Sequence, residues 1–149
     1  MESVSTICRT DKIKANVSEL LLDVNIDNRG KLIALEKKSN LPFDIKRVYF
    51  IYDTVSGATR GYHAHRNLRQ LLVAVCGSVK IRTETNGKIQ TFLLDSPNKG
   101  LLIEGLVWRE MMNFSQSCVL MVLADRYYDP EDYIRDYNLY TKEMYRDQK

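Results

Sequence analysis

The chain has 149 residues, of which 44% are hydrophobic, and its 22 basic and 19 acidic residues give a formal charge of +3. This length predicts one domain, residues 1–149, with a single core. The charge is small and the basic residues form no cluster, which argues against nucleic-acid binding. No apolar run approaches the length of a membrane span, so we expect no membrane partner.

Three cysteines, Cys8, Cys76 and Cys118, are widely spaced and form no CxxC pair. The pattern favours small buried hydrophobic residues in a reducing compartment over a disulfide or a metal site. Residues 1–14 are mixed polar and do not have the composition of a signal peptide. We therefore expect a cytoplasmic protein.

Short apolar runs broken by turn signals indicate an all-β fold. The early segment 17–24 is compatible with a helix or an edge strand. Further strands are expected at 31–36, 47–52, 71–76, 78–85, 88–94, 101–104, 106–111 and 118–124. Gly77 suggests that two of these runs form one long strand bent at a bulge. The set comes to roughly eight to ten strands, enough for a sheet to close or sandwich on itself.

The end of the chain has a different pattern. Residues 129–132, Asp-Pro-Glu-Asp, have the features of a helix start: a capping carboxylate, a proline at the first position and acids near the positive end. A helix is therefore predicted over 133–145. Tyr133, Tyr137 and Tyr140 recur in it at helical spacing, and we interpret them as a packing face rather than a ligand-binding one.

The only two histidines, His63 and His65, stand two positions apart. On a strand both imidazoles would face the same side. The apolar run that follows is typical of a buried strand, so this segment would bring two groups that titrate near neutral pH to one wall of the core. A hydrogen-bonded pair without chemistry is the alternative reading of so short a motif.

The segment 57–77 resembles the first cupin motif, which normally carries glutamate where this chain has Gln70. The second cupin motif normally supplies another histidine, and this chain has Arg109 there instead. A carboxylate and an imidazole of a cupin metal site are thus absent, so we expect no metal and no other cofactor. An arginine suits an anion or a developing oxyanion instead.

Six blocks in order along the chain resemble the dTDP-4-keto-6-deoxyglucose 3,4-ketoisomerases of bacterial deoxysugar pathways: 29–36, 45–51, 60–65, 94–97, 107–111 and 127–129. The resemblance implies a cupin jelly-roll barrel, to which the sequence adds a short C-terminal helix. It also implies a homodimer in which an N-terminal strand pairs with the partner's sheet. The segment up to Asp27 has few partners of its own, which agrees with such an exchange.

Members of that family move the ketone of dTDP-4-keto-6-deoxy-D-glucose from C4 to C3 through an enediol or enediolate. The product would supply 3-amino-deoxysugars for glycans such as lipopolysaccharide O-antigen or the S-layer. A base with a pKa near 7 suits the proton transfer, and no metal or redox cofactor is required. We expect His63 to be this base, and His65 to relay a proton or hold sugar hydroxyls. Tyr49, which alternates with its neighbours on the strand 47–52, would meet the O3/O4 region.

Three arginines, Arg29, Arg60 and Arg109, would share the enediolate and the pyrophosphate. Arg60 could instead order its loop by pairing with a carboxylate. Arg109 could instead form an internal salt bridge with Glu104 or Glu110. Family members differ at the positions of Arg29 and Arg109 and in the face on which C4 is protonated, so the galacto or gluco configuration of the product stays open.

Three other functions fit parts of the pattern. A dTDP-sugar 3,5-epimerase is also a cupin with a catalytic histidine and tyrosine, but it is longer, and the block 108–111 does not look like its counterpart. A non-catalytic cupin that binds sugar nucleotides would exchange no proton at C3. A metal-dependent cupin oxygenase would need the metal that the sequence argues against.

Overall fold

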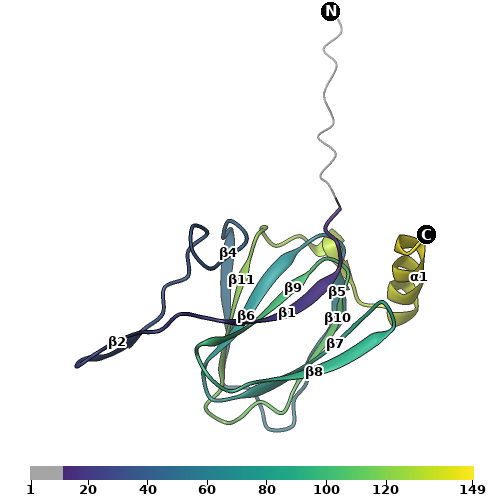
Figure 1. Cartoon of the computed structure of the whole chain (residues 1–149). Helices are drawn as coiled ribbons and strands as arrows, with labels where there is room; N and C mark the ends of the chain where they lie inside the picture. Colours follow the sequence, from purple (N-terminus) through teal and green to yellow (C-terminus); the bar gives the residue numbers. More distant parts are fainter. Residues whose placement is uncertain (1–11) are drawn as a thin grey trace, which may run out of the picture.

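The computed structural model describes residues 12–149, in which two antiparallel five-stranded sheets face each other (Figure 1). The first sheet has the order β1 (Asn16–Leu21), β9 (Lys99–Glu104), β6 (Arg69–Cys76), β11 (Val119–Ala124) and β4 (Arg47–Ile51). The second has the order β12 (Tyr133–Ile134), β5 (Arg60–His65), β10 (Trp108–Met112), β7 (Val79–Thr85) and β8 (Lys88–Leu94). A helix, α1 (Tyr137–Asp147), follows. The prediction of an all-β fold with a short C-terminal helix is confirmed.

The main core lies between the two sheets, and a second apolar layer covers the outside of the first sheet. Strand β6 belongs to both: Leu72 and Ala74 face the interior, whereas Leu71 packs with Leu41 and Phe43 on the outside. A strand buried on both faces has no polar alternation. This explains why its sequence is a continuous apolar run.

The chain turns sharply between β6 and β7, which lie in different sheets. The expectation of one long strand bent at Gly77 is therefore wrong. Gly77 adopts a φ of +66°, and a Cβ there would lie 2.7 Å from Cys118 Cα. Only glycine fits this reversal, because it has no Cβ to clash and adopts positive φ freely. Cys118 is buried, as expected, but Cys76 is exposed.

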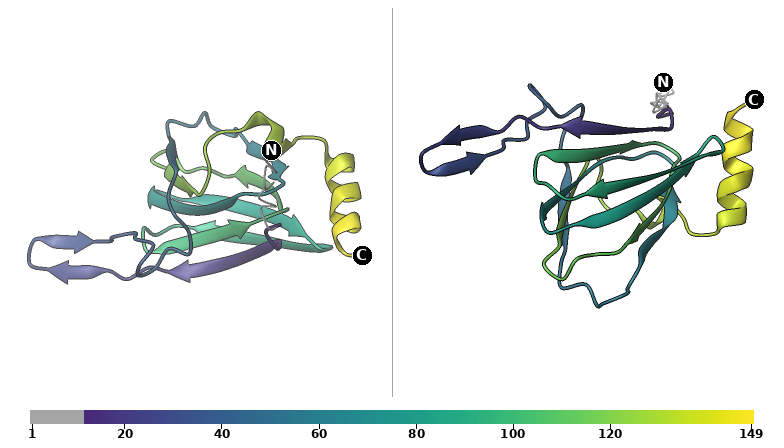
Figure 2. Two further views of the ribbon diagram at one scale, coloured as in Figure 1. Left: turned by 90° about the horizontal axis from the view of Figure 1, so that it is seen from above. Right: turned by 60° about the horizontal axis from the view of Figure 1, so that its bottom comes forward.

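The early segment is an edge strand, not a helix. β1 runs antiparallel to β9 of its own chain, from Asn16 opposite Glu104 to Leu21 opposite Lys99. The expectation that residues up to Asp27 have few partners in their own chain is therefore wrong for β1. The residues that follow leave the barrel as a hairpin of β2 (Asn25–Asp27) and β3 (Gly30–Leu32), which projects away from both sheets (Figures 1 and 2). Cys8 lies outside the described residues.

The predicted helix over 133–145 begins four residues late. The Asp129 side chain does accept a hydrogen bond from the backbone N–H of Glu131, but the structure it caps is a single 3₁₀ turn, Pro130–Asp132. The chain then extends as β12, which pairs with β5, and a second cap at Asp136 starts α1. Sheet pairing across the sequence thus overrides the local helix signal at Tyr133.

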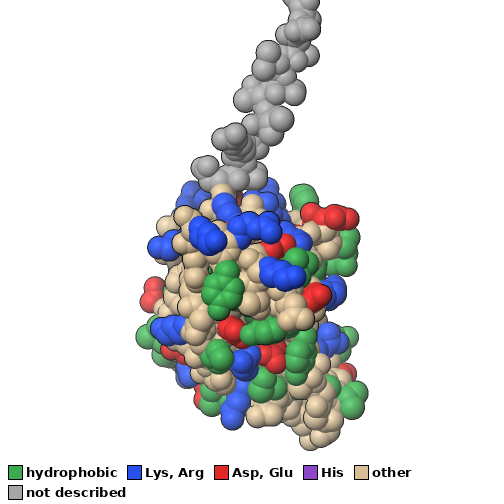
Figure 3. All heavy atoms as spheres, turned by 90° about the vertical axis from the view of Figure 1, so that its right-hand side faces the viewer, with side chains coloured by type: hydrophobic (Ala, Val, Ile, Leu, Met, Phe, Trp, Pro, Cys, Tyr) green, Lys and Arg blue, Asp and Glu red, His purple; other side chains and the backbone are tan. Residues whose placement is uncertain are grey.

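Helix α1 packs on the outer face of the second sheet. Tyr140 and Met144 are buried there against Trp108 and Ala64. Tyr140 therefore belongs to a packing face, as the sequence predicted. In residues 12–149, no helix combines the length and the apolarity needed to cross a membrane. On the face drawn in Figure 3, basic and acidic side chains are interspersed.

Candidate active site

Strand β5 places both histidines on one wall of the barrel. Ala64 between them packs outward under α1, so His63 and His65 face the interior, as the alternation of a strand requires. Their rings meet edge to face, with centroids 4.9 Å apart. The prediction that the two imidazoles share a side is confirmed.

A third ring completes this cluster. β12 pairs with β5 so that Tyr133 lies opposite His65. The Tyr133 ring centroid is 5.0 Å from that of His63 and 4.3 Å from that of His65. Our interpretation of Tyr133 as a packing residue on a helix is therefore wrong, because the residue lies on a strand beside the histidines. A strand of two residues leaves no periodic signal from which this could be predicted.

The 3₁₀ turn before β12 brings a carboxylate to the second histidine. Asp132 Oδ2 lies 3.0 Å from His65 Nδ1, and Asp132 Oδ1 accepts a hydrogen bond from the backbone N–H of Asn67 at 2.9 Å. Burial opposes ionisation of this carboxyl, but the hydrogen bonds from His65 and Asn67 hold the pKa of Asp132 below its usual value. Asp132 is thus a carboxylate acceptor for His65.

Arg109 is buried, with 1% of its surface exposed, on β10 directly opposite His63. Its guanidinium donates to the side-chain carbonyl of Gln70 and to the backbone carbonyl of Val107, the latter from Nη2 at 3.1 Å. Burial lowers the pKa of Arg109 to about 10, so the group stays charged at neutral pH. It is a cation fixed beside His63.

The internal salt bridge considered for Arg109 is not formed. Glu110 pairs with Arg82 instead, and Glu104 pairs with Arg69 at 3.1 Å. Within residues 12–149, Arg109 has no carboxylate partner among the salt bridges. Its positive charge is therefore available to act on groups in the barrel interior.

Tyr49 on β4 lies in the barrel interior, as the alternation along its strand predicted. Its hydroxyl oxygen accepts a hydrogen bond from Gln70 Nε2 at 3.2 Å, and the Arg47 guanidinium lies 4.6 Å from its ring centroid. Burial raises the pKa of Tyr49, which keeps the phenol protonated at neutral pH. Gln70 therefore links Arg109 to Tyr49, an arrangement that needs an amide because one side must accept and the other donate.

A cavity of about 610 Å³ opens at this end of the barrel. Its lining includes one histidine, three tyrosines and three arginines: His63, Tyr49, Tyr52, Tyr133, Arg47, Arg60 and Arg135. Arg60 forms no salt bridge with a carboxylate of the described residues, so the alternative loop-ordering ion pair is not seen. Arg47 and Arg135, which the sequence analysis did not select, add to the positive charge at the mouth.

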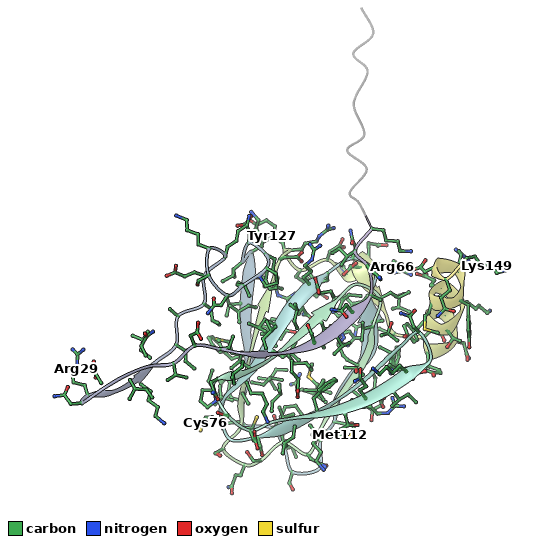
Figure 4. All side chains as sticks on the ribbon, in the orientation of Figure 1. Arg29, Arg66, Cys76, Met112, Tyr127 and Lys149 are labelled. Atoms are coloured by element: carbon green, nitrogen blue, oxygen red, sulfur yellow. The ribbon has the colours of Figure 1, made fainter. Side chains whose placement is uncertain are left out.

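Not every predicted residue reaches this cavity. His65 lies in a small adjoining pocket of about 40 Å³ together with Asp132. Arg109 is buried and does not line the cavity. Arg29 stands at the tip of the β2–β3 hairpin, far from the barrel of its own chain, where its Nη2 pairs with Asp27 Oδ2 at 2.6 Å (Figure 4).

Both histidines are poor proton acceptors. Burial, reinforced by the charge of Arg109, lowers the pKa of His63 to about 3. Burial likewise lowers the pKa of His65 to about 4, against the opposing effect of Asp132. The expected base with a pKa near 7 is therefore not present before a ligand binds, because a buried cation and lost hydration disfavour the imidazolium. At neutral pH both rings are uncharged.

Comparison with known proteins places these features in context. Residues 15–145 match the model of the family described as FdtA: WxcM-like, C-terminal. The TDP-4-oxo-6-deoxy-alpha-D-glucose-3,4-oxoisomerase of Aneurinibacillus thermoaerophilus is 50% identical over 117 residues, which are 78% of this chain and 84% of that protein.

Solved structures of sugar 3,4-ketoisomerases also resemble this chain. The sugar 3,4-ketoisomerase QdtA of Thermoanaerobacterium thermosaccharolyticum, in complex with TDP, superposes with a TM-score of 0.85 at 45% identity, covering 89% of this chain and 96% of that one. A histidine-to-asparagine mutant of QdtA, in complex with TDP-4-keto-6-deoxyglucose, gives a TM-score of 0.85 at 44% identity, covering 88% and 95%.

Proposed function

Because the chain belongs to the FdtA, WxcM-like C-terminal family, we propose that it converts TDP-4-keto-6-deoxyglucose to the 3-keto isomer in the cavity beside His63. It is a sugar 3,4-ketoisomerase, as the sequence predicted and as its relatives confirm. The observation that carries the location is the neutral imidazole of His63 in a cavity that three arginines border. A nucleotide sugar needs such positive charge for its pyrophosphate.

The positions of His63 and Tyr49 in the cavity suggest the steps of the reaction. The uncharged His63 takes the proton from C3, and the electron pair of that C–H bond forms the C3–C4 double bond while O4 gains negative charge. O4 takes up a proton and O3 loses one, so that the C3–O3 bond becomes the new ketone while the electron pair of the C3–C4 double bond takes a proton at C4. Tyr49, protonated and held by Gln70, is a hydrogen-bond donor for the developing oxyanion. His65 and Tyr133 lie where protons can be passed on.

The low pKa of His63 is compatible with this role. A bound nucleotide sugar brings a pyrophosphate with negative charge, and the enediolate adds more. Both favour the imidazolium and so raise the pKa of His63 in the complex. Arg109 cannot be displaced from its buried position without breaking its bonds to Gln70 and Val107. It therefore stabilises the enediolate through its field rather than by lining the cavity.

The pyrophosphate would be held by Arg47, Arg60 and Arg135. All three line the cavity, and two of them are kept in place by aromatic rings: Arg47 over Tyr49 and Arg135 over Tyr133, the latter at 4.5 Å. Guanidinium groups suit phosphate oxygens because they donate in a planar fork.

Arg29 takes part only if a second copy of the chain completes the site. The hairpin that carries it projects from its own barrel, and Ile26 and Leu32 on it are 69% and 60% exposed. Apolar side chains in so exposed a hairpin favour burial against a partner. We therefore keep the homodimer as a proposal, in which the β2–β3 hairpin, rather than β1, is the N-terminal segment exchanged and Arg29 reaches the partner's cavity.

The wider biological role rests on the expectations from sequence. We propose that the 3-keto product is aminated for a glycan such as an O-antigen or an S-layer, and that the enzyme works in the cytoplasm. Cys76 and Cys118 are both free thiols, which suits a reducing compartment.

Product analysis tests the function directly. Purified protein is incubated with TDP-4-keto-6-deoxyglucose, and the sugar is identified by NMR. Formation of the 3-keto isomer is expected. Tight binding of TDP with an unchanged keto sugar would instead identify a non-catalytic binding protein, and inversion at C3 or C5 with the ketone retained at C4 would identify an epimerase.

A further inference from the structure

The carboxylate of Asp132 has two hydrogen-bond donors, one for each oxygen. Oδ1 accepts from the backbone N–H of Asn67, and Oδ2 lies 3.0 Å from His65 Nδ1. Asp132 has little freedom to turn, because the 3₁₀ turn that carries it is closed by the Asp129 cap and by Pro130. His65 is therefore held by a rigid carboxylate that can only accept, which places the proton of the neutral ring on Nδ1.

With the proton on Nδ1, the other ring nitrogen of His65, Nε2, is unprotonated and carries a lone pair. That atom is buried and has no hydrogen-bond partner within residues 12–149, and the same holds for Nδ1 of His63. The two atoms belong to rings whose centroids are 4.9 Å apart. Because each atom lacks a partner in this part of the chain, the two are not hydrogen-bonded to each other. The lone pair in the adjacent ring acts on His63 through its electrostatic potential, which favours a proton on Nδ1 of His63. The other nitrogen of His63, Nε2, is then the unprotonated one that remains for a ligand in the cavity.

We propose that Asp132 is a positioning residue that sets the tautomers of both histidines, so that His63 presents Nε2 to the substrate as a base. The expected fall in kcat rests on the proposed function. The position of the proton on Nδ1 of each ring does not depend on any activity. A general base must carry its lone pair on the nitrogen that faces the substrate.

The substitution Asp132→Asn separates this role from a structural one. An asparagine has one carbonyl oxygen, and the backbone N–H of Asn67 requires it. The NH₂ group then faces His65 Nδ1 and donates to it, which moves the proton of His65 to Nε2. The acceptor beside His63 is thereby lost. We expect kcat to fall at least roughly tenfold while KM changes less than about threefold.

Long-range ¹H–¹⁵N NMR reads the tautomers directly, and the chain has only two histidines to assign. The spectrum of His63→Asn assigns the signals of His65. We expect the Nδ1–H tautomer for His65 in the native protein and the Nε2–H tautomer in Asp132→Asn. Glu131→Gln is the matched control, because it removes one negative charge from the same turn and its side chain does not contact His65; its tautomers and kcat should equal those of the native enzyme.

Two results would overturn the proposal. One is an Nε2–H tautomer of His65 in the native protein, which decides the matter even if Asp132→Asn does not fold. The other is an Asp132→Asn enzyme with native kcat. If the native protein shows the expected tautomers but does not isomerise the keto sugar, the proposed function fails and the tautomer assignment stands.

Discussion

Arg109 donates a hydrogen bond to the side-chain carbonyl of Gln70, the residue that stands where cupins normally carry glutamate. The two positions at which the sequence departs from a cupin metal site are therefore bonded to each other. The side-chain N–H of Gln70 in turn donates a hydrogen bond to the Tyr49 hydroxyl. A glutamate could not donate to Tyr49, and a histidine at position 109 could not reach both Gln70 and Val107 in the same way.

Replacing Arg109 by histidine tests its role in the reaction. Arg109→His removes the permanent charge beside His63 and the two bonds that fix it. We expect a fold with native circular dichroism and a change in turnover, in the C4 configuration of the product, or in both, because the enediolate loses the buried cation opposite His63. Kinetics and NMR of the product measure the two effects. A variant that melts earlier yet yields the same product at the same rate would make Arg109 structural and would point to Arg29 for stereochemical control.

Activity should survive exhaustive chelation. The reasoning rests on the donor set: a neutral amide and a guanidinium stand where a cupin metal site has a carboxylate and an imidazole, and neither replaces an anionic or imidazole ligand. Turnover after prolonged treatment with a chelator, compared with untreated enzyme, is the measurement, together with metal analysis of the purified protein. A stoichiometric transition metal whose removal abolishes activity and whose return restores it would overturn this expectation.

The buried histidines should make stability depend on pH. The pKa of His63 is lowered to about 3 in the folded protein, whereas an unfolded histidine titrates near 6.5. Between these values the unfolded chain binds more protons. The contribution of His63 to the free energy of unfolding is therefore complete above pH 6.5 and is lost as the pH drops toward 3.

Urea unfolding at pH 7 and pH 5 measures this loss. We expect His63 to account for on the order of 1–2 kcal/mol of it. The variant His63→Asn, which does not titrate, should lose correspondingly less stability over the same interval. Equal losses in the native protein and the variant would mean that His63 is not buried as a neutral ring.

A mixed dimer tests whether Arg29 acts in the partner's site. Arg29→Ala and His63→Asn are each expected to impair activity when expressed alone. In a heterodimer of the two, one site would combine the intact His63 of one chain with the intact Arg29 of the other. Co-expression at equal levels should then restore roughly a quarter of native activity, since half of the dimers are mixed and each has one intact site.

Two controls accompany this experiment. Sedimentation of the native protein should show a dimer at micromolar concentration. Absence of any restored activity in verified heterodimers would show that Arg29 does not act in the partner's site, and a monomeric native protein would contradict the dimer itself.

Much of the fold could be predicted because its signals are local. Alternation along 47–51 placed Tyr49 inside, and the two-residue spacing of His63 and His65 put both rings on one face. The sequence does not predict the reversal at Gly77, because a bulge within one strand and a crossover between two sheets place a glycine at the same position. Which of them occurs depends on the strands that pair with β6 and β7, and those are distant in sequence.

The sequence predicts those site residues whose side-chain type alone suggests a chemical role, such as the two histidines and Arg109. The sequence predicts a helix start at Asp132 and Tyr133, since Asp-Pro-Glu-Asp caps a 3₁₀ turn and an α-helix alike. Their approach to His65 depends on the pairing of β12 with β5, two strands that are distant in sequence. The low pKa of His63 was likewise beyond the sequence, because it depends on burial and on the position of Arg109.

Deuterium incorporation tests the central claim, that His63 removes the proton from C3. Native enzyme and His63→Asn are each incubated with TDP-4-keto-6-deoxyglucose in deuterated water and followed by NMR. We predict that the native enzyme forms the 3-keto sugar with loss of the C3 proton and deuterium at C4, whereas His63→Asn binds TDP with near-native affinity but neither exchanges C3 nor forms product. Isomerisation by His63→Asn at a near-native rate would contradict the account.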